Sequence, residues 1–486
     1  MIITIKPRPL KGCIKAIPSK SFAHRALISA AISGRPTRVF CTETSDDIDS
    51  TVNCLSSLGA NIRETKDGFE VIGSDFTVTG SWKGESSNGR ITANCGESGS
   101  TLRFLLPVAC ALGISAEFRM EGRLPYRPMN ELIENLIRGG CNITKDGNSI
   151  FCSGKFTGKE FALPGNVSSQ YFSGLLFAFA ASGGGRIEVL GNLESEGYID
   201  ITCSVLNDFG VPVLKKENIY EVLPGSFPAV RESKDSKESK NTLQTEEFYD
   251  FRVEGDWSNA AFWLVAGAVS GNCKGDGVVC TGLNAESLQD DRNILDILKR
   301  FGAQVDISDE YKPCPDVKEE DSTVGVYTDC RKESGKLVEY PSIYAQKISV
   351  SGGNLSGGEV DGKQNPDIVP IAAALACAAK GRSTIVNSSR LRFKESDRLA
   401  ATSRTLNALG ASIEETKDGL IIEGTGSLKG GRVGSFGDHR IAMTAAIASC
   451  ICDGEVIIEG AEAVAKSYPK FFEDFAKLGG EVYIDN

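Results

Sequence analysis

The chain has 486 residues, more than one hydrophobic core usually organises, so we expect two domains. Hydrophobic residues make up 41% of the chain, as in ordinary globular proteins, and a formal net charge of −11 argues against a nucleic-acid-binding protein. The 15 cysteines lack metal-binding spacing, and no long apolar run or signal peptide is present, so we expect a cytoplasmic protein that contacts no membrane.

A short pattern recurs six times: an apolar residue, a glycine, a small or apolar residue, any residue, and then Ile or Val. The glycine is typical of a helix C-terminus, and the alternation after it predicts a strand. Two copies are nearly identical, LGANIRETKDGFEVIG at 58–73 and LGASIEETKDGLIIEG at 409–424, and their Lys-Asp-Gly predicts a hairpin turn. We therefore expect six repeated units, three per domain, each with a helix and a β-hairpin. The glycines that mark them are Gly59, Gly140, Gly210, Gly302, Gly410 and Gly479.

The predicted elements begin with a strand at Ile2–Ile5, which is available to pair with the C-terminal half of the chain. Several later helices are apolar almost all round and should therefore be buried, with the sheets outside them. They cover residues 171–181, 260–269, 371–379 and 441–450. Two amphipathic helices, at 291–301 and 398–409, should lie nearer the surface.

Two segments have the composition of insertions. Residues 227–247 contain the charged tract RESKDSKESK, and residues 310–344 are rich in Pro, Lys and Glu with little periodicity. We expect both to be exposed loops that extend hairpin tips after the third and fourth repeats. The boundary between the domains should fall near residues 249–255.

Polar residues gather at six predicted helix starts. Free N–H groups and the helix dipole make a helix N-terminus an anion site, whereas a cation there gains nothing from the helix itself. Cations nevertheless recur in these segments, and both histidines of the chain, His24 and His439, lie in them. The sequence therefore predicts binding of a ligand with more than one anionic group. The segments begin at Pro18, Gly96, Asn166, Asn365 (with Pro366 as the first helical residue), Lys394 and Gly437.

Nine motifs in these and neighbouring segments resemble the 3-phosphoshikimate 1-carboxyvinyltransferase (EPSP synthase) family of enolpyruvyl transferases, in the family's order from residue 18 to residue 472. The motifs are PSKSFAHRAL (18–27), GESGSTLRF (96–104), RLPYRPM (123–129), NVSSQYFSGLL (166–176), YIDIT (198–202), NPDIVPIAAALA (365–376), RFKESDRLA (392–400), GDHRIAM (437–443) and AKSYPKFF (465–472).

The resemblance implies an α/β fold, an inverted barrel-like arrangement of six helix-plus-sheet units in two domains, with buried helices whose N-termini face the interdomain cleft. The first domain would cover 20–250, and the second 1–19 plus 251–486. The implied reaction transfers the enolpyruvyl group of phosphoenolpyruvate to the 5-hydroxyl of shikimate 3-phosphate and releases phosphate, a step of aromatic amino acid biosynthesis. It needs no cofactor or metal, and a monomer is expected. Members of the family are inhibited by glyphosate.

The resemblance also implies a role for particular residues. Shikimate 3-phosphate would be bound by Lys20, Ser21, Arg25, Ser168, Ser169, Gln170, Ser195, Asp367 and Lys394. Phosphoenolpyruvate would be bound by Lys20, Gly99, Arg127, Gln170, Arg398, Arg440 and Lys466, and His439 and Tyr198 are possible additions. Asp367, Glu395 and Lys20 would be catalytic, and the sequence leaves open which of them makes each proton transfer.

Two positions depart from the enterobacterial type of the family, which has Asn at both: Glu97 and Arg390. An alternative is UDP-N-acetylglucosamine enolpyruvyl transferase, which uses a flexible loop with a catalytic Cys. The corresponding segment here, EFRMEGRLPYRPM at 117–129, has no Cys. A second alternative is a non-catalytic anion-binding homologue, against which the presence of Lys20, Asp367 and Glu395 argues.

Overall fold

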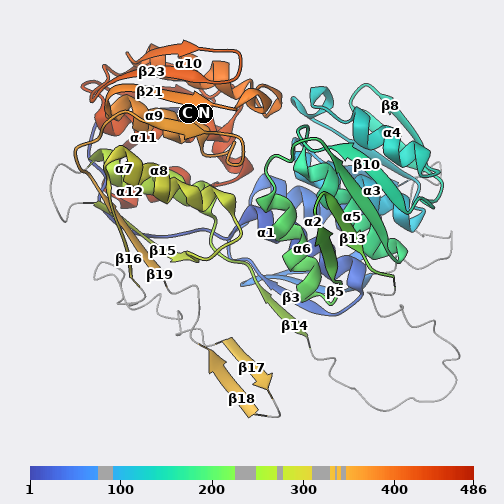
Figure 1. Ribbon diagram of the computed structural model, residues 1–486. Helices are drawn as coiled ribbons and strands as arrows, with labels where there is room; N and C mark the ends of the chain where they lie inside the picture. The colour runs from blue at the N-terminus through green and yellow to red at the C-terminus, as the bar shows by residue number, and fades with distance from the viewer. Residues whose placement is uncertain are drawn as a thin grey trace, which may run out of the picture. The chain divides into compact units, whose positions relative to one another are not determined.

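The computed structural model describes residues 1–74, 91–224, 248–270, 277–308, 329–333, 336–340 and 346–485. The chain forms two compact units (Figure 1). Unit 1 comprises Met1–Ile17, Glu254–Arg392 and Asp397–Asn486, and unit 2 comprises Pro18–Val253 and Phe393–Ser396. The chain thus passes from unit 1 to unit 2 after Ile17 and returns after Val253, and the short segment Phe393–Ser396 groups with unit 2 again.

The second repeat shows the architecture of each unit most simply. Its elements are β6 (Ile91–Asn94), α3 (Gly99–Leu112), β7 (Ala116–Arg119), α4 (Asn130–Arg138), β8 (Asn142–Asp146) and β9 (Ser149–Ser153). They form a four-stranded sheet, β6-β7-β9-β8, in which β6 and β7 are parallel and the hairpin β8–β9 is antiparallel. The repeat therefore contains one helix and two strands more than the helix and hairpin that the sequence predicted.

The third and fifth repeats have the same order of elements. The third consists of β10 (Glu160–Pro164), α5 (Ser169–Ser182), β11 (Gly185–Leu190), α6 (Gly197–Asp208), β12 (Val213–Lys216) and β13 (Ile219–Val222). The fifth consists of β20 (Glu359–Asp361), α9 (Val369–Ala378), β21 (Lys380–Val386), α10 (Arg398–Ala408), β22 (Ser412–Glu415) and β23 (Leu420–Thr425). The described residues form six four-stranded sheets, which confirms the predicted α/β fold of six helix-plus-sheet units.

The sheets of the first and fourth repeats each include one strand from a distant part of the chain. The first has α1 (Lys20–Ser33), β3 (Thr37–Phe40), α2 (Asp46–Leu58), β4 (Ala60–Thr65) and β5 (Gly68–Ser74), and its sheet is completed by β14 (Tyr249–Arg252), parallel to β3. The fourth has α7 (Trp257–Ser270), β15 (Gly277–Leu283), α8 (Ile294–Phe301), β16 (Gln304–Ser308) and β19 (Gln346–Ser351), and is completed by β2 (Gly12–Lys15).

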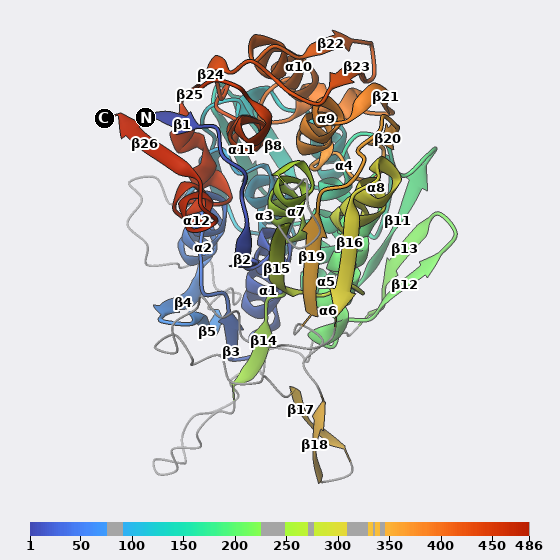
Figure 2. The same ribbon diagram turned by 90° about the vertical axis from the view of Figure 1, so that its left-hand side faces the viewer.

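The sixth repeat uses the N-terminal strand. It contains β24 (Gly431–Gly434), α11 (His439–Ala448), β25 (Val456–Glu459), α12 (Phe471–Lys477) and β26 (Glu481–Asp485). The strand β1 (Ile2–Lys6) lies between β25 and β26 and is antiparallel to both, so the two termini lie side by side (Figure 2). The predicted pairing of this strand with the C-terminal half is confirmed.

Each unit has its own core of apolar helices. In unit 2, α5 packs against both α1 and α3, and in unit 1, α7, α9 and α11 pack against one another. Residues 171–180 of α5 are all buried, as predicted for a helix without a polar face. The helix α10 is more buried than predicted, because only Arg404, Asn407 and Ala408 of its residues are exposed.

The six glycines of the repeated pattern all have the left-handed backbone that the prediction requires. Their φ angles run from 81° at Gly210 to 118° at Gly59, a region that residues with a β-carbon rarely adopt. The predicted Lys-Asp-Gly hairpins are also present, since Thr65 pairs with Gly68 and Glu415 pairs with Leu420.

Two local predictions were wrong. The helix α9 begins at Val369 rather than at Pro366, and the proline in its first turn is Pro370. The segment 310–344 includes an antiparallel hairpin, β17 (Asp329–Glu333) and β18 (Lys336–Tyr340), rather than only loop. The segment 227–247, predicted to be an exposed loop after the third repeat, lies outside the described residues.

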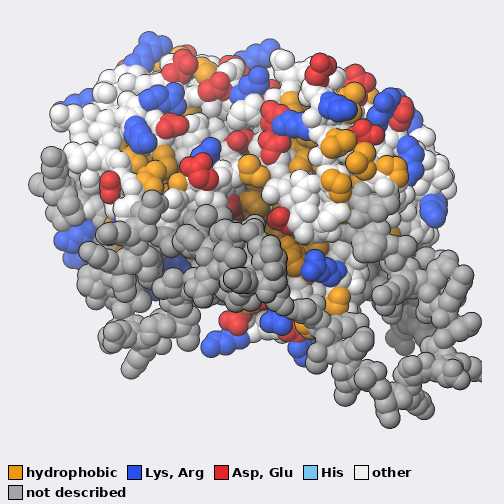
Figure 3. Space-filling view, turned by 60° about the horizontal axis from the view of Figure 1, so that its bottom comes forward, with side chains coloured by type: hydrophobic (Ala, Val, Ile, Leu, Met, Phe, Trp, Pro, Cys, Tyr) orange, Lys and Arg blue, Asp and Glu red, His pale blue; other side chains and the backbone are white. Residues whose placement is uncertain are grey.

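Two surface features complete the description. Lys and Arg side chains are interspersed with Asp and Glu on the described part of the face in Figure 3. None of the described helices has the length and apolar character that a membrane span would require.

Candidate active site

The first predicted anion-binding segment begins α1. Ser19 caps the helix, and the Lys20 ammonium group lies 2.6 Å from a carboxylate oxygen of Asp47 in the first turn of α2. Both side chains are largely shielded, with exposed fractions of 17% and 14%, so the pair is held in place. Asp47 was not among the predicted site residues, although its acidic helix start was a signal that could have been used.

Arg25 lies deeper in α1, and each of its three side-chain nitrogens donates a hydrogen bond to a protein oxygen. Its side chain donates to Thr202 Oγ1 at 2.7 Å and to the carbonyl oxygens of Ser21 and Tyr198 at 2.7 and 2.8 Å. Burial lowers the pKa of this guanidinium to about 10. The structure therefore places Arg25 as a buried clamp between α1 and α6 rather than as an exposed ligand.

His24 begins a chain of hydrogen bonds that connects the helices α1, α2 and α3. Its Nδ1 lies 2.7 Å from Thr51 Oγ1, which lies 2.6 Å from Thr101 Oγ1, which donates to the α3 cap Ser98 at 2.8 Å. Burial, and then the nearby Lys20 and Arg25, hold the pKa of His24 well below its ordinary value. A neutral imidazole fits this role of fixing α2 and α3 next to α1.

Two guanidinium groups meet at the first residue of α3, Gly99. A β-carbon there would lie 2.6 Å from Arg103 Nη1 and 2.7 Å from Arg127 Nη1, so only glycine leaves room for both. The Arg103 side chain donates to Gln170 Oε1 and to the Pro128 carbonyl, each at 2.9 Å. Its pKa is lowered to about 10 by burial and then by the neighbouring Arg127.

This cluster has an excess of positive charge. Arg127 lies 3.5 Å from Glu395, and the Nε atoms of both arginines are buried without a hydrogen-bond partner in the described part of the chain. Arg103 has only neutral hydrogen-bond partners there. Buried cations with unused donors favour a small carboxylate or phosphate as ligand. Arg103 was not among the predicted site residues, although it lies in the motif GESGSTLRF at 96–104.

The start of α5 supplies the hydroxyl and amide groups of the predicted site. Ser168 caps the helix by accepting from the Gln170 amide, Ser169 is buried, and Gln170 Nε2 donates to Ser100 at 2.8 Å. Ser195 is also buried and has a left-handed backbone, with φ of 55°. Such strain in a residue other than glycine is typical of functional sites.

A second charged cluster lies in unit 1 around Asp367. Its two carboxylate oxygens lie 2.8 Å from Arg398 Nη1 and 3.0 Å from Arg440 Nη2. Both guanidinium groups are almost fully buried, whereas the Asp367 side chain is 20% exposed. Arg398 and Arg440 therefore bind the Asp367 carboxylate from the buried side, and the carboxylate stays partly exposed to solvent.

The α11 cap organises this cluster. Asp438, which is fully buried, accepts from the Arg440 amide at 3.0 Å and from Arg398 Nε at 2.8 Å. Arg440 also donates to Ser258 Oγ at 3.0 Å, in the first turn of α7. Neither Asp438 nor Ser258 was predicted as a site residue, and GDHR in the sequence was the available signal for Asp438.

The remaining predicted residues of this region are close to the same helix starts. Lys466 donates to the Gly437 carbonyl at 2.6 Å, and His439, which is buried, lies 3.9 Å from Asp438. Lys394 is half-buried in the segment that clusters with unit 2. Of the two departures, Arg390 donates to the Lys363 carbonyl at 2.8 Å, and the Glu97 carboxylate covers Gly122.

The predicted site residues thus form two groups. Unit 2 contains Lys20, Ser21, Arg25, Gly99, Arg127, Ser168, Ser169, Gln170, Ser195, Tyr198, Lys394 and Glu395, and unit 1 contains Asp367, Arg398, His439, Arg440 and Lys466. The unit 2 group combines cations with the hydroxyls of Ser168, Ser169 and Ser195 and the amide of Gln170.

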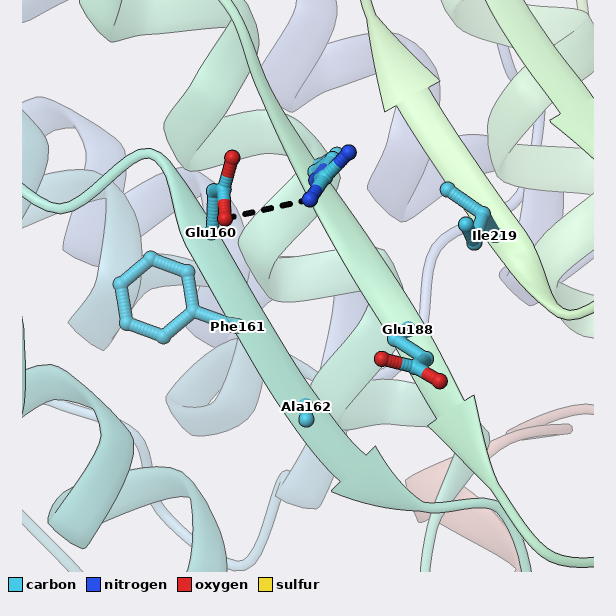
Figure 4. A pocket seen from close by; sticks show the side chains of 6 residues that line it. Glu160, Phe161, Ala162, Glu188 and Ile219 are labelled. Carbon is cyan, nitrogen blue, oxygen red and sulfur yellow. Dashed lines mark ion pairs between the residues drawn. The ribbon is translucent and has the colours of Figure 1, made fainter.

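A pocket of about 220 Å³ lies elsewhere, on the outer face of the sheet β10-β11-β13-β12 (Figure 4). It is lined by Glu160, Phe161, Ala162, Arg186, Glu188 and Ile219. Arg186 is paired with Glu160 at 3.2 Å, and Glu188 accepts from Asn218. The pocket contains two carboxylates and one paired guanidinium group, so it lacks the excess of positive charge found at the helix starts. The pocket is therefore not part of the site described above.

Comparison with known proteins decides the family. The sequence profile of EPSP synthase (3-phosphoshikimate 1-carboxyvinyltransferase) matches residues 5–475. The chain belongs to the EPSP synthase family. The match covers all nine quoted motifs, so the resemblance inferred from them is confirmed.

Relatives of full length share the family name. The 3-phosphoshikimate 1-carboxyvinyltransferase of Clostridium kluyveri is 36% identical over 483 residues, which is 99% of this chain and 98% of the relative. Those of Clostridioides difficile and Clostridium beijerinckii are 36% and 37% identical, over 99% and 98% of this chain and 98% and 97% of the relative.

Solved structures show the same fold. An EPSP synthase from Acinetobacter baumannii matches with a TM-score of 0.71 at 24% identity, over 99% of this chain and all of the other. The enolpyruvyl transferase NikO from Streptomyces tendae matches with a TM-score of 0.67 at 15% identity, over 99% and 98%. Two proteins with different names thus share the architecture, so the fold alone does not decide the activity.

Proposed function

We propose that this chain is a 3-phosphoshikimate 1-carboxyvinyltransferase. It transfers the enolpyruvyl group of phosphoenolpyruvate to the 5-hydroxyl of shikimate 3-phosphate by addition and elimination, and releases phosphate. The observation that carries the proposal is the match to the EPSP synthase family over residues 5–475. The cationic helix starts support it, because both substrates are anions with more than one charge.

We assign the donor, phosphoenolpyruvate, to the arginines and their neighbours. Arg127 has a buried Nε with no partner in the described residues, and Arg398 and Arg440 are held rigidly by carboxylates. The other donor ligands are Lys20, Gly99, Gln170 and Lys466. The acceptor, shikimate 3-phosphate, is assigned to Ser21, Arg25, Ser168, Ser169, Ser195 and Lys394, together with Lys20, Gln170 and Asp367. The three side-chain nitrogens of Arg25 already donate hydrogen bonds to protein oxygens, so the assignment of Arg25 has the least support in this set.

Three groups would move protons. Asp367, partly exposed between two buried guanidinium groups, takes the proton from the 5-hydroxyl as the bond to the donor forms. Glu395, beside Arg127 and helped by Lys20, transfers the proton at the methylene carbon of the donor. The cations favour the ionised carboxylates and stabilise the negative charge of the intermediate.

We also propose that residues 20–250 and 1–19 plus 251–486 are the two domains of the enzyme. The ligand set draws on both, so neither is expected to be active alone. The enzyme is proposed to act as a cytoplasmic monomer, without nucleic acid or membrane as partner. Light scattering on the purified protein tests the monomer, for which we expect a mass near 51.9 kDa.

A phosphate-release assay tests the function. We expect release only when phosphoenolpyruvate and shikimate 3-phosphate are both present, and none when UDP-N-acetylglucosamine replaces the acceptor. Release with the nucleotide sugar instead would favour the other transferase. Binding of both substrates without any release would favour a non-catalytic homologue.

A further inference from the structure

Two loops of the second repeat lie against each other, and Glu97 connects them. The first, which we call the α3 loop, covers residues 95–98, and the second, the Arg127 loop, covers residues 120–127. A β-carbon on Gly122, in the Arg127 loop, would collide with both carboxylate oxygens of Glu97, the further of them 2.8 Å away. Gly122 also has a left-handed backbone, with φ of 52°, which favours glycine. The Glu97 carboxylate therefore packs directly on the backbone of the Arg127 loop.

Backbone hydrogen bonds join the same two loops just before this contact. The Cys95 amide donates to the Arg119 carbonyl at 2.9 Å. The Glu121 amide donates to the Gly96 carbonyl at 2.7 Å. Past Glu121, the described residues show no further backbone hydrogen bond between the two loops. The contact of Glu97 therefore continues the attachment of the Arg127 loop beyond the point where these hydrogen bonds end.

The far end of the Arg127 loop reaches the site proposed for phosphoenolpyruvate. Arg127 Nη1 would lie 2.7 Å from a β-carbon on Gly99, the first residue of α3. Two turns connect this end with the Glu97 contact, since the Leu124 amide donates to the Glu121 carbonyl at 3.1 Å and the Arg127 amide donates to the Leu124 carbonyl at 3.2 Å. A shift of the loop by about 1 Å would misplace the guanidinium group, and misplacements of this size are costly.

We propose that Glu97 is a positioning residue of the phosphoenolpyruvate subsite: its carboxylate packs on Gly122 and holds the loop that presents Arg127 to the donor. The inference deepens the function proposed above and rests on it. The charge of Glu97 alone would have the opposite effect, because an anion beside an anion-binding site repels the donor. The direction in which donor affinity changes when the carboxylate is removed therefore distinguishes positioning from repulsion.

The test compares Glu97→Ala with Glu97→Gln. In Glu97→Ala the KM for phosphoenolpyruvate should rise about tenfold, the factor that corresponds to ~1.4 kcal/mol. The KM for shikimate 3-phosphate should stay within about twofold of the parent value, since Arg127 is assigned to the donor only. Glu97→Gln fills the same space without the charge and should keep the donor KM within about threefold of the parent value. The melting temperature of both variants should stay within about 2 °C of the parent.

Gly122→Ala tests the same contact from the other side. Its methyl group must push the Glu97 carboxylate away, so the donor KM should rise by a similar factor. Gly34→Ala is the matched control for backbone strain. Gly34 has φ of 65° at the C-terminal end of α1, and an added β-carbon would have no atom within 4 Å. This variant should leave both KM values unchanged.

Three results would overturn the inference while leaving the proposed function intact. The first is a donor KM that is unchanged or lower in Glu97→Ala. The second is an equal rise of both KM values with a lower melting temperature, which would mean that Glu97 only stabilises the fold. The third is a donor KM in Glu97→Gln as high as in Glu97→Ala. A parent enzyme that releases no phosphate from the two substrates would contradict the proposed function, and this inference would fall with it.

Discussion

At the scale of single residues, Gly99 controls the position of two cations. Its missing β-carbon lets Arg103 and Arg127 approach the start of α3, and both side chains are buried, so they have little room to withdraw. Any side chain at this position must displace at least one guanidinium group.

We expect glyphosate to occupy the donor position in this chain, with its phosphonate reaching further than the phosphate of phosphoenolpyruvate. Gly99→Ala should therefore weaken the binding of glyphosate more than that of phosphoenolpyruvate. We expect the wild-type enzyme to be inhibited competitively with phosphoenolpyruvate. In the variant we expect the inhibition constant of glyphosate to rise by about 100-fold or more and the KM for phosphoenolpyruvate to rise by about tenfold. Losses of this size are typical when a binding group is displaced by about 1 Å. Steady-state kinetics at several inhibitor concentrations give both constants. Equal changes in the two constants would contradict this explanation.

Asp47 holds Lys20 in place, so its charge should matter for turnover. Asp47→Asn keeps the size of the side chain but removes the anion 2.6 Å from the Lys20 ammonium group. We expect kcat to fall by about tenfold to 100-fold, the usual cost of a misplaced catalytic group. Asp49→Asn, an exposed acid in the same helix turn, is the control and should leave kcat unchanged. A similar loss in both variants would point to the helix dipole instead of the ion pair.

Some of these residues could be predicted from the sequence and others could not. Caps and first-turn cations are local signals, so Lys20, Gly99 and Arg440 could be located from short motifs. The Lys20–Asp47 pair spans 27 residues, and its geometry depends on how α1 packs against α2. Burial also depends on packing. The hydrogen bonds that Arg25 donates to other protein groups could therefore not be predicted from the sequence.

At the scale of elements, the sixth sheet depends on a strand from the other end of the chain. The central position of β1 between β25 and β26 buries Ile3 and Ile5 completely, while Ile2 stays half-buried. Glycine positions and alternation predicted the helices and hairpins, because both are local. The pairing of β2 with β15 and of β14 with β3 joins strands that are far apart in the sequence. The alternation of apolar residues within a strand does not specify such a partner.

Ile3→Ala should destabilise the protein by leaving a cavity in this sheet. We expect the free energy of unfolding of unit 1 to fall by about 2–4 kcal/mol, as for other large-to-small changes in a core. Ile2→Ala removes the same atoms from a half-buried position and should cost about 1 kcal/mol or less. Denaturant titrations measure both. Equal effects would mean that β1 is not a central strand.

The tract 227–247 should be dispensable for catalysis. Its charged, Ser-rich composition cannot form a core, and none of the site residues lies in it. Replacing residues 231–240 with a short Gly/Ser turn should leave kcat within about twofold of the parent value, the range typical of changes remote from a site. A collapse of kcat in a variant with an unchanged circular dichroism spectrum would show that the tract is functional.

At the scale of the whole molecule, one helix-plus-sheet unit occurs six times in the described part of the chain. In the first, second, third and sixth repeats the helix after the first strand begins with a Ser or Asp cap next to a cation or hydroxyl. The fifth repeat has no such cap, since α9 begins after Ile368. The fourth repeat differs, since its α7 start is capped by Asp256 and supplies Ser258 as a partner of Arg440. Its first turn, WSNA, has no cation and therefore supports a neighbouring charge instead of binding a ligand itself.

The central claim is that this chain joins phosphoenolpyruvate to shikimate 3-phosphate. Phosphorus and proton NMR on a reaction of the purified enzyme with both substrates, after dialysis against a chelator, tests it most directly. The account predicts one phosphate released for each enolpyruvyl ether formed at the 5-hydroxyl, with no added metal or cofactor. Phosphate released without that ether, or an ether formed only on UDP-N-acetylglucosamine, would contradict it.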